Sequence, residues 1–232
     1  MGKQVRGLLY LFATDSRRSV ITFWIIFLST MALSLFAAAL FNSPNMRMFF
    51  WLPMPLYIYC GVFGFIMAKQ AIPFSIKIGA TRKSIFTTVI LFFAGLAVLQ
   101  SLLINCVDIL IGNLISAVKL TSFHVMHPFE QIGPNWISTV LIDSAVLFFL
   151  LTSLFAFGLL FYRYGLIGGG SLSGLVLVFL VIAGGKGWIT DFGSFVYRTL
   201  SLTTFLYLFG IALIVYGLSW LLLRRAAVSK PV

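Results

Sequence analysis

The sequence predicts an all-α polytopic membrane protein with six transmembrane helices. Of its 232 residues, 61% are hydrophobic and only 9% are charged, and the mean hydropathy is +1.09. A soluble domain carries about 25% charged residues, so this chain lacks the polar surface that water requires. Six stretches free of Asp, Glu, Lys and Arg are each long enough to span a bilayer as a helix, which takes about 20 apolar residues. The alternation typical of a membrane barrel is absent.

The spans follow one another along the chain with short connections. We place them approximately at residues 20–41, 49–69, 84–112, 136–162, 166–185 and 204–223. Residues 19–223 therefore form one transmembrane domain, 70–83 form a cytoplasmic connection, and 224–232 form a cytoplasmic tail. The first apolar segment is too long for a cleaved signal peptide, whose apolar region is about 7–15 residues long, so we expect it to be retained.

The positions of Lys and Arg predict the orientation, because these residues concentrate in cytoplasmic segments. With the N-terminus inside, the cytoplasmic segments hold Lys3, Arg6, Arg17, Arg18, Lys69, Lys77, Arg82, Lys83, Arg163, Arg224, Arg225 and Lys230. The outer segments hold only Arg47, Lys119, Lys186 and Arg198. We therefore expect both termini to be cytoplasmic. The net charge of +11 lies at the membrane edges, which argues against a nucleic-acid partner.

The first 18 residues carry an amphipathic pattern. Val5, Leu8, Leu9 and Phe12 recur at helical spacing, with charged residues largely off that stripe. We expect an interfacial helix that lies flat at the boundary between headgroups and acyl chains. The alternative is a plain cytoplasmic extension of the first span.

Prolines punctuate the second span and the connection after it. Pro53 and Pro55 predict a kink or a late start at its outer end. In the connection, Pro73 suits a first helical turn and Gly79 suits a C-terminal cap, which predicts a separate helix of one to two turns. Thr81 is placed to cap the third span, which starts near Ser84, remains apolar past Asn105 and is expected to continue beyond the bilayer to Val118.

Two cations follow this cap. Arg82 and Lys83 lie in the first turn of the third span, where the helix macrodipole disfavours positive charge by about 0.3–1 kcal/mol. Membrane topology alone could explain them. A docking surface that requires cations is the more specific hypothesis.

Two carboxylates fall in the outer half of the membrane domain. Asp108 lies near the outer end of the third span, and Asp143 lies about two turns into the fourth. An intramembrane Asp costs about 2.5–3.5 kcal/mol on insertion scales and is usually partnered or faces a cavity. These residues either line the substrate path, or they snorkel to the interface or pair with Lys186 or Arg198.

Other candidate sites are weaker. His124, His127 and Glu130 are spaced three apart, but no fourth ligand accompanies them and Pro128 argues against one helix, so we expect no metal site. Cys60 and Cys106 lie in or at the end of spans and are expected to behave as small hydrophobic residues.

The fifth span begins with a glycine-rich segment. Only residues 162–165 join it to the fourth span, which predicts antiparallel neighbours. Gly170 and Gly174 form a small-xxx-small pair that suits close helix packing within the chain or, as an alternative, a dimer face. Interfacial aromatic residues in 184–203 indicate either short helices dipping into the outer leaflet or an aromatic belt.

Catalytic signatures are missing from the chain. The sequence has no phosphate-binding GxxxxGK[ST] loop, no HExxH, no CxxC pair, and a single Glu. We therefore expect no catalytic site and no bound cofactor in this chain.

The segment PFSIKIGATRKSIF resembles the corresponding stretch in small permease subunits of type-2 ABC exporters. The resemblance covers essentially the whole architecture: an N-terminal amphipathic helix, six spans, and a short coupling helix between the second and third. It implies a bacterial cytoplasmic-membrane protein whose coupling helix docks on a separate ATPase subunit, which binds the ATP and Mg, and whose transport path is shared with a second, identical or similar permease. Carried over by position, the contact residues are Phe74, Ile76, Lys77, Ile78, Arg82 and Lys83.

The resemblance implies an exporter for an amphipathic or hydrophobic substrate, with peptides or antibiotics as the expected classes because small members of the family often export them. Two alternatives remain. One is a secondary transporter or channel driven by an ion gradient, and the other is a membrane scaffold that transports nothing.

Overall fold

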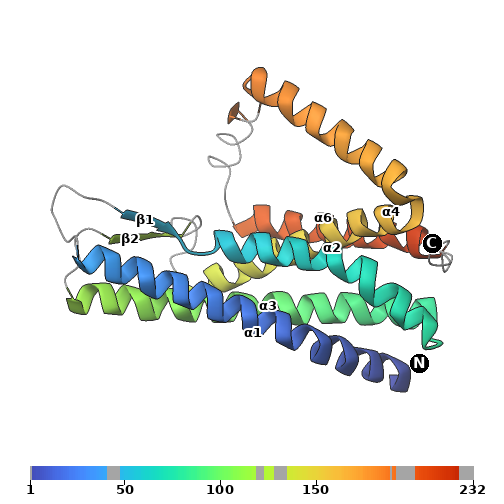
Figure 1. Cartoon of the computed structure of the whole chain (residues 1–232), viewed down its shortest axis with the longest axis horizontal. Helices are drawn as coiled ribbons and strands as arrows, with labels where there is room; N and C mark the ends of the chain where they lie inside the picture. Colours follow the sequence, from blue (N-terminus) through green and yellow to red (C-terminus); the bar gives the residue numbers. More distant parts are fainter. Residues whose placement is uncertain are drawn as a thin grey trace.

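The computed structural model describes residues 2–40, 48–118, 123–127, 135–188, 190–191 and 202–224. It confirms the all-α membrane class. Six helical segments are long and apolar enough to cross a membrane: 2–40, 54–77, 82–118, 136–165, 168–185 and 203–224. Apart from short turns between the helices, the described residues contain one pair of four-residue strands. The helices form an elongated bundle with the strand pair at one end (Figure 1).

Helix α1 (Gly2–Leu40) is one continuous helix of 39 residues. The prediction of a separate N-terminal helix over residues 1–18 is therefore wrong. The structure has the alternative arrangement, in which these residues extend the first span. The amphipathic stripe packs on protein, because Leu8 and Phe12 are buried in the main core and the Phe12 ring meets Phe92 edge-on at 6.0 Å. At 1.5 Å per residue, α1 is about 58 Å long, well beyond a hydrocarbon core of about 30 Å.

Helix α2 (Met54–Lys77) begins later than the expected residue 49, as the prolines predicted. Pro53 is the N-cap and Pro55 lies in the first turn, where the missing N–H costs no helical hydrogen bond. The preceding residues form β1 (Met48–Trp51), which pairs in parallel with β2 (Phe123–Met126). The strand pair thus joins the start of α2 to the segment that follows the third helix.

The α2–α3 connection is a turn, so the prediction of a separate coupling helix within residues 70–83 is wrong. Helix α2 continues through Pro73 to Lys77, and α3 (Arg82–Val118) starts five residues later. Gly79 has φ +82° and confirms the predicted cap: the N–H groups of Gly79 and Ala80 donate to the carbonyls of Ile76 and Ser75. These two bonds form a Schellman motif. Thr81 also caps as predicted, since its Oγ1 accepts from the Ser84 N–H at 3.3 Å.

Helix α4 (Trp136–Gly185) contains a sharp bend at Gly165, whose φ of 66° and ψ of −161° interrupt the helix. The residues after the bend leave the bundle as an arm, which Figure 1 shows in orange. The expected antiparallel packing of the fourth and fifth spans is therefore confined to the bend. Within the described residues, a Cβ at Gly170 or Gly174 would meet nothing within 4 Å, so the small-residue pair does not pack inside the chain here.

The core is closest-packed between α2 and the first half of α4. A Cβ at Gly64 would lie 2.4 Å from the Leu151 carbonyl oxygen, and one at Gly158 would lie 2.7 Å from that of Phe65. Helix α6 (Leu202–Arg224) returns along the bundle, so that both described ends of the chain lie at the end opposite the strands (Figure 1). This agrees with termini on one side of the membrane. That this side is the cytoplasm stays a prediction.

Candidate functional site

The most distinctive polar feature of the bundle is a buried cluster around Asp143. The Asp143 side chain is 0% exposed. Tyr57 Oη donates to Asp143 Oδ1 at 2.6 Å, and Asn105 Nδ2 donates to Oδ2 at 2.7 Å. His127 Nε2 lies 3.2 Å from the same Oδ2. We call Tyr57, Asn105, His127 and Asp143 the Asp143 cluster.

All three partners can serve the carboxylate as donors. An ionised carboxylate has only acceptor sites, and its hydrogen bonds to N–H and O–H donors are stronger than those between neutral groups. His127 completes the set when its Nε2 carries the proton. When the whole imidazole is protonated, the same contact becomes an ion pair. The cluster can therefore hold a buried negative charge without a lysine or arginine.

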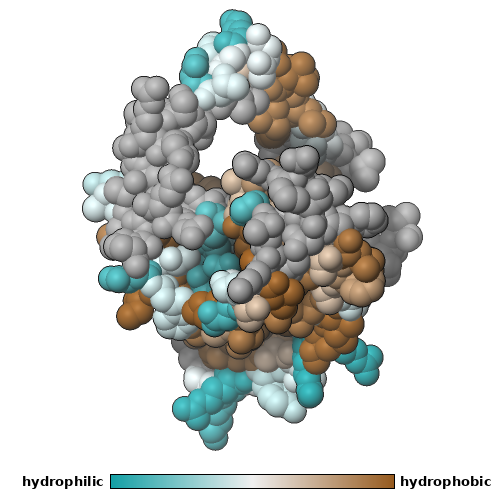
Figure 2. All heavy atoms as spheres, turned by 90° about the vertical axis from the view of Figure 1, so that its left-hand side faces the viewer, coloured by the Kyte–Doolittle hydropathy of each residue, from teal (hydrophilic) through white to brown (hydrophobic). Residues whose placement is uncertain are grey.

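Four different segments place these side chains together. Tyr57 lies in the first turn of α2, Asn105 in the middle of α3, and Asp143 in the second turn of α4. His127 directly follows β2, and the Leu52 N–H donates to the Met126 carbonyl at 3.4 Å. The strand pair thus ties the His127 segment to the entry of α2, at the end of the bundle where hydrophilic residues gather near the centre of the face (Figure 2).

The polar contacts continue along α3. Asn105 Nδ2 also donates to the Ser101 carbonyl, and Ser101 Oγ donates to the Val140 carbonyl of α4 at 2.7 Å. Directly before Ser101 in the sequence, Gln100 is fully buried, and its Oε1 accepts from Trp24 Nε1 at 2.8 Å. Polar side chains of α3 therefore connect α3 to α1 and to α4 through the apolar core.

The expected ion pairing of Asp143 with Lys186 or Arg198 is not what the structure shows. Neutral donors and a histidine surround Asp143, while Lys186 Nζ lies 5.0 Å from the centre of the Trp188 ring. Arg198 lies outside the described residues. Asp108 is half-buried on α3 and is not among the groups bonded to Asp143.

The two histidines of the outer segment point to different partners. His124 is exposed on β2 and stacks on Phe49 of β1 at 5.8 Å, whereas His127 is turned inward to Asp143. They therefore do not share one face as potential metal ligands. Glu130 lies outside the described residues. Cys60 is buried and Cys106 is exposed, both as free thiols.

The predicted ATPase contact residues lie at the opposite end of the bundle. Phe74 and Ile78 are 51% and 55% exposed, one helical turn apart. Lys77, Arg82 and Lys83 are also exposed, so five of the six residues are exposed at this end of the bundle. Ile76 cannot contribute in the same way, because it is half-buried and packs on the main core.

Arg82 has a structural partner that the sequence did not reveal. Its Nη1 donates to the backbone carbonyl of Arg224, in the last turn of α6. A cation is favourable at a helix C-terminus, where the free carbonyls carry negative partial charge. This contact accounts for a cation in the disfavoured first turn of α3: Arg82 stabilises the end of a neighbouring helix.

Comparisons of this chain with known protein families, with curated proteins and with solved structures found no match. The assignment of function therefore rests on the residues and their geometry.

Sequence reasoning found Asp143 but missed its partners. Tyr57 and Asn105 are polar residues within apolar spans, and His127 was considered only for metal binding. The signal that could have found Asn105 is its spacing from Ser101, four residues earlier on the same face of α3. His127 carried no such signal, because its position depends on a strand pairing between segments more than 70 residues apart.

Proposed function

We propose that this chain is the transmembrane permease subunit of an ATP-driven exporter, energised by a separate ATP-binding cassette ATPase. It would move an amphipathic or hydrophobic substrate, with a peptide or an antibiotic as the expected class. The observation that carries the proposal is the α2–α3 connection. It presents two exposed apolar side chains, Phe74 and Ile78, together with the exposed Lys77 and Lys83 at one end of a membrane bundle.

This surface has the composition of a docking site. Phe74 lines a cavity of about 280 Å³ between α1 and α2, together with Leu11, Asp15 and Gln70. An apolar anchor in the centre of an interface contributes more to binding than the charges at its rim, which mainly affect the rate of association. Phe74 and Ile78 would be the anchor, and Lys77 and Lys83 would meet acidic residues of the ATPase.

The connection can also transmit force to the rest of the bundle. Gln4 of α1 accepts hydrogen bonds from Thr81 and Ser84, and Arg82 holds the end of α6. A displacement of the turn would therefore reach α1, α2, α3 and α6 together. Inside the bundle, Phe93, Phe148 and Phe155 are each at most 2% exposed, which favours a substrate route against a second permease over one through a single chain.

The test is purification of the chain from its native membrane, followed by measurement of ATP hydrolysis in the purified complex after reconstitution in vesicles. We expect an ATP-binding cassette ATPase to co-purify and to hydrolyse ATP faster in the presence of the permease. A chain that purifies without any ATPase from its native membrane contradicts the proposal.

A second candidate function is a transporter driven by an ion gradient, and the contact between Asp143 and His127 favours it. Buried ionisable residues within membrane bundles often mark proton or ion pathways. Transport that follows a proton or sodium gradient without ATP would support this alternative. ATP-dependent transport that is unaffected by collapsing the gradient would exclude it.

A further inference from the structure

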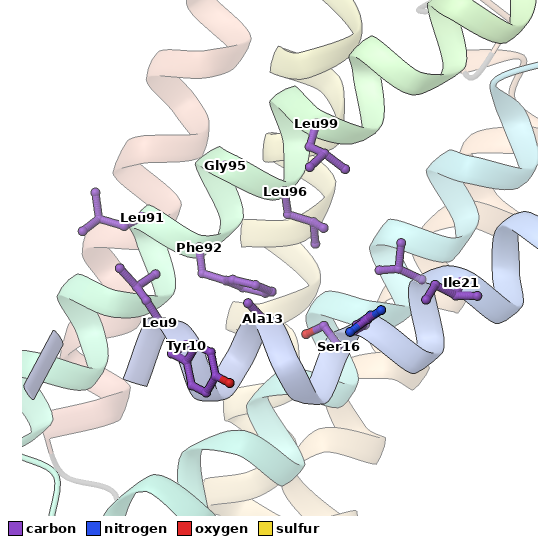
Figure 3. Close-up of a pocket in the computed structure, with 12 residues that line it drawn as sticks. Leu9, Tyr10, Ala13, Ser16, Ile21, Leu91, Phe92, Gly95, Leu96 and Leu99 are labelled. Carbon is purple, nitrogen blue, oxygen red and sulfur yellow. The ribbon is translucent and has the colours of Figure 1, made fainter. Parts of the chain in front are cut away.

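Helices α1 and α3 run side by side and leave an apolar groove on the flank of the bundle. They touch where Phe12 meets Phe92 and where Trp24 donates to Gln100. Alongside these contacts lies a groove of about 620 Å³, within the range of about 300–1,000 Å³ usual for ligand sites (Figure 3). Its walls include Leu9, Val20 and Ile21 of α1 and Leu91, Leu96 and Leu99 of α3.

The polar lining of this groove is confined to α1. Ser16, Arg17 and Tyr10 contribute to the wall, but Ser16 Oγ already donates to the Phe12 carbonyl at 2.5 Å. Arg17 and Tyr10 are exposed, and neither forms a side-chain hydrogen bond or ion pair with another described residue. The groove therefore offers one guanidinium and one phenol as donors, and no carboxylate of the described residues forms an ion pair with the cation.

The groove lies beside an apolar part of α3. Leu91 and Leu99 are nine and 17 residues from Arg82, or about 13 and 25 Å along the helix axis. The α3 wall falls within the charge-free stretch from Ser84 to Val107. An exposed guanidinium beside this apolar wall can pair with an anion, and a lipid supplies both an anion and an apolar chain to fill the groove.

We propose that this groove binds one anionic phospholipid. An acyl chain lies between α1 and α3, and the headgroup phosphate accepts hydrogen bonds from the Arg17 guanidinium and the Tyr10 hydroxyl. A guanidinium matches a phosphate by bidentate hydrogen bonding, so the arginine at this position suits a phosphate headgroup. The site is separate from the ATPase contact and does not depend on the proposed transport function.

Gly95 gives a clean way to block the groove. It lies on the α3 wall, and a Cβ built there would meet nothing within 4 Å (Figure 3). Gly95→Leu should therefore fold while filling the space that the acyl chain occupies. Gly112→Leu is the matched control, because Gly112 is an exposed glycine of the same helix, outside the groove, with equally open surroundings.

The experiment is native mass spectrometry of the full chain in detergent, supplemented with either phosphatidylglycerol or phosphatidylcholine. For the unmodified chain, we expect one phosphatidylglycerol to remain bound at collision energies that strip phosphatidylcholine. Arg17→Gln should abolish this difference, while Arg18→Gln, which changes a neighbouring cation outside the groove, should retain it. Gly95→Leu should lose the retained lipid, while Gly112→Leu should keep it.

Three results would overturn the proposal. The first is equal retention of the two lipids by the unmodified chain, and the second is an unchanged preference in both Arg17→Gln and Gly95→Leu. The third is displacement of phosphatidylglycerol by inorganic phosphate alone, which would identify a phosphate site without an acyl chain.

Discussion

At the scale of single residues, Asp143 is the side chain whose replacement should cost the most stability. An asparagine there keeps one acceptor and introduces an NH₂ group facing Tyr57, Asn105 or His127, all of which serve as donors. Leaving a buried polar group unsatisfied costs about 1–3 kcal/mol, and more where a charge is involved. We therefore expect Asp143→Asn to lower the midpoint of thermal unfolding in detergent.

The control for this experiment is Asp15→Asn, which changes an exposed carboxylate of α1 and should leave the midpoint unchanged. If Asp143→Asn is as stable as the unmodified chain, the Asp143 cluster does not stabilise the bundle. Transport by the same variant then reports separately on a functional role.

The Trp24–Gln100 hydrogen bond gives a second prediction at this scale. Gln100 Nε2 is buried without a partner in the described structure, so the Trp24 indole supplies the one hydrogen bond that this side chain makes. Trp24→Phe should destabilise the bundle by about 1–3 kcal/mol, because it leaves the whole amide unsatisfied. The double variant Trp24→Phe/Gln100→Leu should recover most of this loss in chemical unfolding. A double variant less stable than Trp24→Phe would contradict the assigned role.

At the residue scale, the sequence predicts features that one segment carries alone, and it does not predict contacts between distant segments. A carboxylate in an apolar span is visible in the sequence, and so is a glycine at a turn. The identity of the groups that satisfy Asp143 is not, because three helices and a strand end must first assemble around it. Arg82 is a similar case, since its acceptor on α6 is 142 residues away.

At the scale of elements, the stability of the α2–α3 turn should depend on the backbone conformation of Gly79. Its φ of +82° is unfavourable for residues with a Cβ, by about 1–2 kcal/mol, although space around the position is open. Gly79→Ala should therefore lower stability through the backbone alone. Gly7→Ala, within the regular helix α1 and equally open, should be neutral or slightly stabilising. Equal effects of the two substitutions on the unfolding midpoint would contradict this account of the turn.

Hydrophobic periodicity predicted the apolar face of the N-terminal segment but not its packing partner. The stripe of Val5, Leu8, Leu9 and Phe12 correctly marked an apolar face, but the face packs on α2 and α3 rather than lying flat in the interface. An amphipathic pattern records that one side is apolar and does not record what covers it. Similarly, Pro73 suggested a helix start, yet it lies inside α2.

At the scale of the whole molecule, the arm that follows Gly165 should contact a second permease. Only 12% of its most apolar window is buried, and large apolar side chains cover several of its faces. Gly174→Leu should weaken such a dimer by preventing close helix approach, while Gly112→Leu on α3 should not. Photobleaching of single labelled complexes in nanodiscs measures the copy number. One permease per complex in the unmodified protein would contradict dimerisation.

The central claim is that work from an ATPase enters the membrane at the α2–α3 connection, and co-purification of that ATPase with Phe74→Ala tests it most directly. Truncating a central apolar anchor typically costs at least about 2 kcal/mol of binding, or roughly a 30-fold loss of affinity. We expect Phe74→Ala to insert normally and to lose the ATPase, Lys77→Ala to lose much less, and Phe36→Ala, an exposed phenylalanine of α1, to lose none. Full retention of the ATPase and of transport by Phe74→Ala would show that this connection is only a turn.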